Sequence, residues 1–267
     1  NVFRVYIDNE TSKVIQPKRN SLPKIRDLLH IVNTFNNEKI FFADKVVLVE
    51  GIGDRLIFQR LIKEYQKDNQ EIVEIIEVHG KQNLLKYRNF LNLFAIENYI
   101  IADLDYVSNI GDQNIKKIFV VDYAKIDEDV LANKKSEDGK CLAKFLKETI
   151  DNIETLNEKQ MENLKSLWRY IESRYKKLRD DMSDEEKRLL DEFIESKRTE
   201  GIYILKYGEI EDYFPQLSKN RSFESIVEFV TSENFNKWLQ ETKGDDKRKD
   251  LDSILFKILG IKDGLCS

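Results

Sequence analysis

The sequence predicts an α/β fold in which a parallel, doubly wound β-sheet is flanked by helices and interrupted by a helical insertion. Short apolar runs alternate with segments of helical periodicity, in the order strand 45–49, helix 53–67, strand 72–78, helix 82–95 and strand 99–102. This order is typical of parallel strands joined by crossover helices. A stretch rich in Lys, Glu, Leu and Arg then covers about 136–199, and strand character resumes at 201–205.

The first and third strands of the predicted sheet have the clearest sequence signals. Lys45-Val46-Val47-Leu48-Val49 is a continuous, largely β-branched run that stops at Glu50-Gly51. Such a run suits a strand that is buried on both faces, as in a parallel sheet. The third strand ends at Ala102 and continues directly into Asp103-Leu104-Asp105.

The residues before the sheet read as a small separate feature. Residues 1–16 are expected to form one or two short strands with a turn at Asp8-Asn9-Glu10. Two prolines mark a connector, and apolar spacing predicts a helix at 23–37. We therefore interpret residues 1–40 as the end of, or the linker from, another domain.

The second half of the chain is mainly helical by sequence. A fourth strand is predicted at 115–121, followed by a helical insertion at 126–200. Its last helix opens on Ser183-Asp184-Glu185-Glu186, which has the form of a capping box. After the strand at 201–205 a final helical region is expected, with a basic polar loop at 243–249.

Composition excludes several functional classes. The chain has 267 residues, of which 35% are charged, and its net charge of −5 argues against binding nucleic acid by bulk positive charge. Two distant cysteines indicate neither a zinc cluster nor a disulfide framework. No apolar stretch of about 18 residues, signal peptide or P-loop occurs. We expect a cytoplasmic protein without a membrane partner that is not an ATPase by itself.

Acidic residues follow three of the predicted strands. The first strand is followed by Glu50 and Asp54, the third by Asp103 and Asp105, and the strand at 201–205 by Glu211 and Asp212. The carboxyl ends of parallel strands meet at one edge, where ligands bind. Carboxylates gathered there repel one another unless a cation neutralises them, and hard oxygen ligands favour Mg²⁺ or Mn²⁺. The pattern predicts a site for such ions.

Each feature also has a plain structural interpretation. Glu50 alone could be a solvated carboxylate at a strand end, and residues 209–212 could be an ordinary acidic turn. The pair Asp103 and Asp105 is more specific, because two acids after an apolar strand are costly to bury unpaired. The basic loop at 243–249 could be a solvated surface, or one of its lysines could meet a phosphate.

These motifs resemble the Toprim domain of the OLD (overcoming lysogenization defect) family of nucleases. Residues 41–54, with Glu50-Gly51 at the strand end, are similar to the opening of that domain, and Asp103-Leu104-Asp105 matches its DxD motif. The segments 78–83 and 208–213 resemble two further parts of it. The resemblance implies a Rossmann-like Toprim sheet whose first part is 41–125 and whose second part is 201–267.

The resemblance also implies a chemistry and a set of partners. In the family an ABC-type ATPase domain precedes the Toprim domain, which cuts DNA, so ATP is expected only at an upstream domain. Two metal ions are implied, one held by Asp103 and Asp105 and the other surrounded by Glu50, Asp54 and Glu211, and Asp212 is also expected to be a metal ligand. A lysine near the C-terminus is implied to stabilise the transition state, with Lys243 the first choice and Lys247 the second.

Family members include anti-phage defence proteins, some of which work with a helicase partner. We therefore expect a Mg²⁺- or Mn²⁺-dependent DNA endonuclease or nickase that forms a homo-oligomer, a dimer or higher, through the amphipathic insertion. One alternative is a non-catalytic regulatory or oligomerisation module. Another is a topoisomerase- or primase-like Toprim activity, for whose extra catalytic elements the chain has no obvious room. A DxD-type phosphatase fits less well, because its motif follows the first strand.

Overall fold

A computed structural model describes residues 3–8, 10–18, 20, 37–66, 71–132, 140–141, 144, 147–148, 157–217 and 221–261. It divides into two compact units, which we call unit 1 (residues 1–106 and 193–267) and unit 2 (residues 107–192). The helix predicted at 23–37 lies almost entirely outside the described residues. None of the helices in the described ranges is both long and apolar enough to cross a membrane.

Unit 1 is built on a four-stranded parallel sheet, which confirms the predicted fold class. Its strand order is β4-β3-β5-β8. The strands are β3 (Lys45–Val49), β4 (Val73–Glu77), β5 (Glu97–Ala102) and β8 (Ile202–Ile204). Every residue of β3 is buried, as its unbroken apolar run predicts. The return of the chain to β8, beside β5, places three acidic segments at one edge of one sheet.

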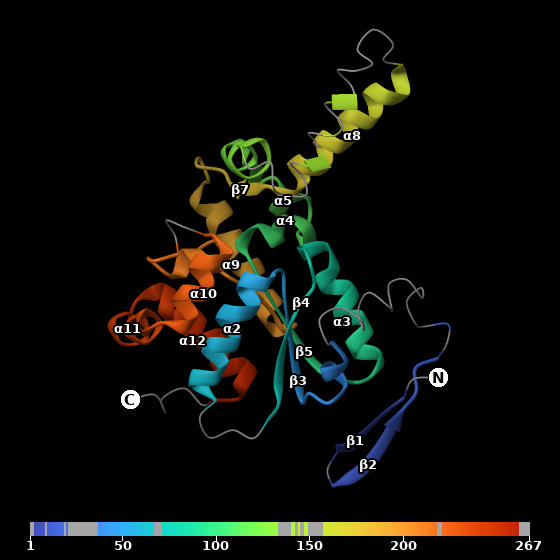
Figure 1. Cartoon of the computed structure of the whole chain (residues 1–267), viewed down its shortest axis with the longest axis vertical. Helices are drawn as coiled ribbons and strands as arrows, with labels where there is room; N and C mark the ends of the chain where they lie inside the picture. Colours follow the sequence, from blue (N-terminus) through green and yellow to red (C-terminus); the bar gives the residue numbers. More distant parts are fainter. Residues whose placement is uncertain are drawn as a thin grey trace. The chain divides into compact units, whose positions relative to one another are not determined.

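Helices cover both faces of this sheet (Figure 1). One face packs against α2 (Ile52–Tyr65) and the C-terminal helices α10 (Phe223–Thr231), α11 (Glu233–Glu241) and α12 (Asp246–Leu259) in a single large apolar core. On the other face lies α3 (Leu84–Leu93), which follows the short helix η3 (Lys81–Asn83) and contacts β5 and β3. The sheet is therefore fixed from both sides, and its carboxyl edge is left for ligands.

The basic loop predicted at 243–249 is mostly helical, which corrects that expectation. Helix α12 begins at Asp246, and the Lys249 N–H donates to the carbonyl of Asp245 at 2.9 Å. Acidic residues at a helix N-terminus are favoured by its partial positive charge, so Asp245 and Asp246 mark the start of the helix. Helix α12 consequently includes the three basic residues Lys247, Arg248 and Lys249.

The remaining elements of unit 1 include a hairpin, short 3₁₀ turns and the C-terminal end of a helix that begins in unit 2. The hairpin of β1 (Arg4–Asp8) and β2 (Thr11–Ile15) is antiparallel, as predicted for residues 1–16. The other short elements are 3₁₀ turns, namely η2 (Asn37–Phe41), η4 (Leu104–Tyr106) and η7 (Ile210–Tyr213). Helix α9 (Asp184–Thr199) opens on the predicted capping box, in which the Glu186 N–H donates to Ser183 Oγ at 3.2 Å.

Unit 2 corrects the prediction of a fourth strand at 115–121. Asp112 Oδ1 accepts from the N–H groups of Asn114 and Ile115, so the chain starts helix α5 (Gln113–Lys116) there. Only β6 (Phe119–Val121) is a strand, and it pairs antiparallel with β7 (Lys176–Leu178) in a separate sheet. The other described helices of the unit include α4 (Val107–Ile110), α6 (Tyr123–Ile126), a π-helical turn (Asp127–Ala132) and α8 (Glu158–Arg174).

Candidate functional site

The first part of the candidate site is the junction between β3 and α2. Glu50 follows the last residue of β3, and Gly51 caps the N-terminus of α2. The Gly51 N–H donates to Asp54 Oδ2 at 2.8 Å, which holds the Asp54 carboxylate over the first turn of the helix. The carbonyl of Glu50 accepts from the Gly80 N–H at 3.1 Å, so this turn is tied to the segment that follows β4.

The second part is the turn that follows β5. Asp103 comes directly after this strand, and the 3₁₀ turn η4 places Asp105 two residues further on. The Tyr106 N–H donates to the carbonyl of Asp103 at 3.0 Å and closes the turn. Both carboxylate residues are partly exposed, whereas the strand residue Ala102 before them is buried.

The third part is the loop between β8 and α10. The Leu104 N–H donates to the carbonyl of Gly208 at 3.0 Å, which joins this loop directly to the turn after β5. Glu211 lies in η7, and its Oε1 is near Gly53, at 3.7 Å from the position that a Cβ at that glycine would take. The loop therefore places Glu211 beside the first turn of α2.

The carboxylates of these three segments repel one another. Burial, followed by the charges of Glu211 and Glu50, raises the pKa of Asp54 to about 7. The pKa of Asp103 is raised well above its ordinary value by burial and by its neighbours Asp54, Glu50, Asp105 and Glu211. Five of the six predicted acidic residues thus act on one another electrostatically, as the strand-end pattern predicts.

A set of five oxygen-donor carboxylates fits a hard divalent cation such as Mg²⁺ or Mn²⁺. A bound cation would remove the repulsion that raises the pKa values of Asp54 and Asp103. Within the ranges that the structure describes, no three His, Cys, Asp or Glu side chains converge as a ready metal cage. In the structure Asp105 is instead engaged by a lysine.

That lysine is Lys81, in η3, just after β4. Its side chain is buried, with 6% of the residue exposed, and its Nζ forms an ion pair and hydrogen bond with Asp105 Oδ2. A buried ammonium needs a charged partner, so this contact fixes both side chains. Lys81 was not among the predicted site residues. Its signals in the sequence are its position after the second strand and its place in the segment 78–83 that resembles the Toprim domain.

Comparison with known proteins identifies the segment that carries most of this site. Residues 41–105 match the family model of the "Overcoming lysogenization defect protein-like, TOPRIM domain". These residues are an OLD-like Toprim domain. The matched segment contains Glu50, Asp54, Lys81, Asp103 and Asp105.

Two curated relatives extend the likeness beyond the Toprim domain. The Old nuclease of Escherichia phage P2 is 23% identical over 212 residues, which cover 77% of this chain and 33% of the relative. Endonuclease GajA of Bacillus cereus (strain HuB5-5) is 22% identical over 227 residues, which cover 83% of this chain and 29% of the relative. The chain thus spans about a third of the length of these relatives. Together with the Toprim domain, they support a nuclease module.

Asp212, the sixth predicted acid, has a different environment. Its Oδ2 accepts from the Glu209 N–H at 3.0 Å, and its Oδ1 accepts from Arg221 Nη2 at 2.7 Å. It is not among the charges that raise the pKa of the Toprim carboxylates Asp54 and Asp103. The contacts of Asp212 hold its own loop.

The two predicted lysines also differ in their surroundings. Lys247 Nζ donates to the carbonyl of Asp212 at 2.6 Å, from the first turn of α12. Lys243 is exposed in the turn that precedes this helix. The structure therefore brings Lys247, the second choice by sequence, to the loop that carries Glu211.

Proposed function

We propose that this chain is a metal-dependent DNA-cleaving module that hydrolyses phosphodiester bonds with a Mg²⁺- or Mn²⁺-activated water. The observation that carries the proposal is the group of five mutually repelling carboxylates at the carboxyl edge of the Toprim sheet. Such a group is costly in a metal-free protein, as the raised pKa values of Asp54 and Asp103 indicate. The nuclease names of the two relatives support the same reaction class.

In this proposal the chain holds two cations with separate sets of ligands. Asp103 and Asp105 serve one position, and Glu50, Asp54 and Glu211 serve the other. Bound divalent cations supply an activated water and neutralise charge on the phosphate.

The basic side chains have a different role in the proposal. Lys81 holds Asp105 in place through their ion pair. A lysine offsets the charge that develops on the phosphate, and its place beside Asp212 favours Lys247 over Lys243.

The wider context is also a proposal. From the resemblance to the OLD family, we infer that the chain works beside an upstream ABC-type ATPase domain that regulates cleavage. DNA is the proposed substrate, and anti-phage defence is the proposed setting. Self-association of the whole protein and a helicase-type partner belong to the same proposal.

Plasmid cleavage tests the proposed reaction. The protein is incubated with supercoiled DNA and Mg²⁺, Mn²⁺ or Ca²⁺, and nicked and linear products are separated on a gel. We expect cleavage with Mg²⁺ or Mn²⁺ that EDTA abolishes. Glu50→Gln and Asp103→Asn should each lower the rate roughly 100-fold or more, because each removes a ligand charge.

The matched control is Asp181→Asn, which removes an exposed carboxylate of unit 2 and should leave the rate unchanged. Circular dichroism checks that all three variants are folded. Undiminished cleavage by both site variants, or cleavage that persists in EDTA, would overturn the proposal.

A further inference from the structure

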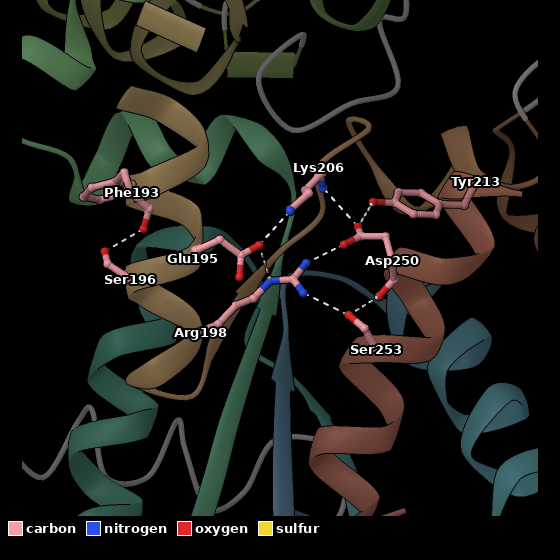
Figure 2. A network of polar contacts seen from close by, with 8 residues as sticks. All are labelled: Phe193, Glu195, Ser196, Arg198, Lys206, Tyr213, Asp250 and Ser253. Carbon is pink, nitrogen blue, oxygen red and sulfur yellow. Dashed lines mark hydrogen bonds and ion pairs between the residues drawn. The ribbon is translucent and has the colours of Figure 1, made fainter. Parts of the chain in front are cut away.

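Helix α12 carries a buried carboxylate, Asp250, that is not one of the acids of the candidate site. Asp250 is 8% exposed, and its Oδ1 forms an ion pair with Arg198 of α9. Arg198 Nη1 also donates to Ser253 Oγ at 2.9 Å, one turn further along α12. Figure 2 shows this network, in which the Arg198 guanidinium lies between Glu195 of its own helix and Asp250. The buried charge of Asp250 is therefore paired.

The second oxygen of Asp250 binds both ends of the loop that carries Glu211. Asp250 Oδ2 accepts from the Lys206 N–H at 3.3 Å, where the chain leaves β8. The same oxygen accepts from the Tyr213 hydroxyl at 2.6 Å, at the end of η7. The Tyr213 oxygen in turn accepts from the Tyr207 N–H at 3.3 Å. One carboxylate thus closes residues 206–213 into a loop.

The Tyr213 hydroxyl is held as a hydrogen-bond donor to Asp250. Burial, and then the charge of Asp250, raises the pKa of Tyr213. Its hydroxyl therefore keeps its proton and donates to Asp250 throughout the neutral range. Tyr213 is 2% exposed, and its ring packs against the ring of Tyr207, with centroids 5.8 Å apart. This packing of the ring holds the hydroxyl in place.

The closed loop is the part of the chain that brings Glu211 to the other acids. Between its two ends, Gly208 accepts from the Leu104 N–H, and Glu211 lies beside the first turn of α2. We propose that Asp250 is a positioning residue that holds the 206–213 loop closed and so fixes Glu211 at the acidic site. This inference rests on the proposed function, since the role of Glu211 there is that of a metal ligand. Groups that orient metal ligands commonly change metal affinity by 10- to 100-fold.

A matched control lies two residues further along the same helix. Asp252 also pairs with an arginine and a tyrosine, since its Oδ1 accepts from Arg248 Nε at 2.7 Å and from the Tyr65 hydroxyl. Those partners lie on α12 and at the end of α2, so the described side-chain contacts of Asp252 join these two helices and not the 206–213 loop. Asp250→Asn and Asp252→Asn therefore each remove a carboxylate that pairs with an arginine and a tyrosine, and the described contacts of Asp250 are the ones that reach the loop.

The experiment compares both variants with the wild type in two measurements. The first is hydrogen exchange of the metal-free protein, followed by mass spectrometry of peptides that cover 204–214. The second is the Mn²⁺ concentration that gives half-maximal plasmid cleavage. We expect Asp250→Asn to speed exchange in this segment and to raise the Mn²⁺ requirement about 10-fold. Asp252→Asn should leave both within about twofold of the wild type, whatever stability it loses.

Tyr213→Phe keeps the inference testable if Asp250→Asn does not fold. It retains the buried ring and the ion pair of Asp250 with Arg198, and removes only the hydroxyl that ends the loop. It should raise the Mn²⁺ requirement about threefold. Equal Mn²⁺ requirements in all variants would overturn the positioning role. A wild type that neither cleaves DNA nor responds to Mn²⁺ would overturn the proposed function and the role of Asp250 in it, while hydrogen exchange would still report whether Asp250 closes the loop.

Discussion

At the residue scale, the candidate site is a source of instability in the metal-free protein. Asp54 is the clearest case, because its pKa rises from 3.8 to about 7 on folding. A carboxyl whose pKa is raised in the folded state favours folding while it is protonated and opposes it once ionised. Its stabilising contribution is complete below about pH 4 and is lost as the pH rises through about 7.

This reasoning predicts the pH dependence of an Asp54→Asn variant in EDTA. The amide keeps an acceptor for the Gly51 N–H and cannot ionise. A shift of about 3 pH units sets a ceiling of about 4 kcal/mol, and coupling to Glu211 and Glu50 lowers the expected difference to about 2 kcal/mol. We expect the variant to match the wild type near pH 4 and to be more stable at pH 8, as measured by urea unfolding.

Mn²⁺ provides the complementary measurement. At pH 8 the metal should stabilise the wild type more than Asp54→Asn, because it neutralises the charge that the variant lacks. The exposed Asp181→Asn variant should follow the wild type at every pH and metal concentration. If the stabilities of Asp54→Asn and the wild type change with pH in parallel, the pKa of the Asp54 carboxyl is not raised on folding.

The sequence indicates those site residues that are acids placed after the strands of the sheet. It does not indicate the other residues of the site. Glu50 and Asp103 each come directly after a strand, and Glu211 lies in the loop that follows β8. In a parallel sheet such positions predict that the three residues converge. Asp250 carries no such mark, and Lys81 follows the second strand but is not an acid. In the sequence, Lys81 is one of many lysines, and its role becomes evident only from its buried ion pair with Asp105. Asp250 is an ordinary acid of a charged helix in the sequence, and its role becomes evident only from the packing of α9 and η7 around it.

At the element scale, long apolar patterns predict structure well, and short elements depend on distant partners. The sheet strand β3 and helix α2 are evident from local periodicity. Strand β6 has three residues, and its partner β7 lies more than 50 positions later, so no local pattern can specify the pair. The N-terminus of α12 was missed because its basic residues resemble a loop, although two acids precede them.

The loop between β8 and α10 gives a prediction at this scale. Gly208 has a φ of 116°, and a Cβ there would lie 2.4 Å from Asp212 Oδ2. Gly244 has a similar φ of 98°, with nothing within 4 Å of the added Cβ. Gly208→Ala should therefore cost roughly 2–3 kcal/mol of stability, from backbone strain and the clash with Asp212 together. Gly244→Ala should cost about 1 kcal/mol, from backbone strain alone.

The two alanine variants also separate stability from site geometry. Because Gly208 accepts from the Leu104 N–H, a shift of its backbone should displace the loop from Asp103 and Asp105 and raise the Mn²⁺ requirement for cleavage. Gly244→Ala should leave that requirement unchanged. If both variants lose equal stability and keep the wild-type Mn²⁺ requirement, the conformation of Gly208 does not matter to the site.

At the scale of the whole molecule, the apolar cluster described around Ile171 in unit 2 is much smaller than the main core of unit 1. The main core of unit 1 joins the sheet to α2 and the C-terminal helices through more than twenty buried side chains. In unit 2, the described apolar cluster centres on three buried residues, Ile126, Val130 and Ile171, with partly buried side chains around them, among them Leu167 and Trp168. Leu167 and Trp168 thus take part in packing their own unit.

Unequal cores predict unequal local stability, which a pair of alanine variants can measure. Ile171 and Ile254 are both fully buried, in unit 2 and unit 1 respectively, so each truncation should cost about 2–4 kcal/mol. Ile171→Ala should speed hydrogen exchange of peptides covering 119–121 and 176–178 while β3 and β5 stay protected, because the smaller core opens alone. Ile254→Ala should loosen β3 and β5 as well. Exchange that rises equally in both units for Ile171→Ala would mean that they unfold as one.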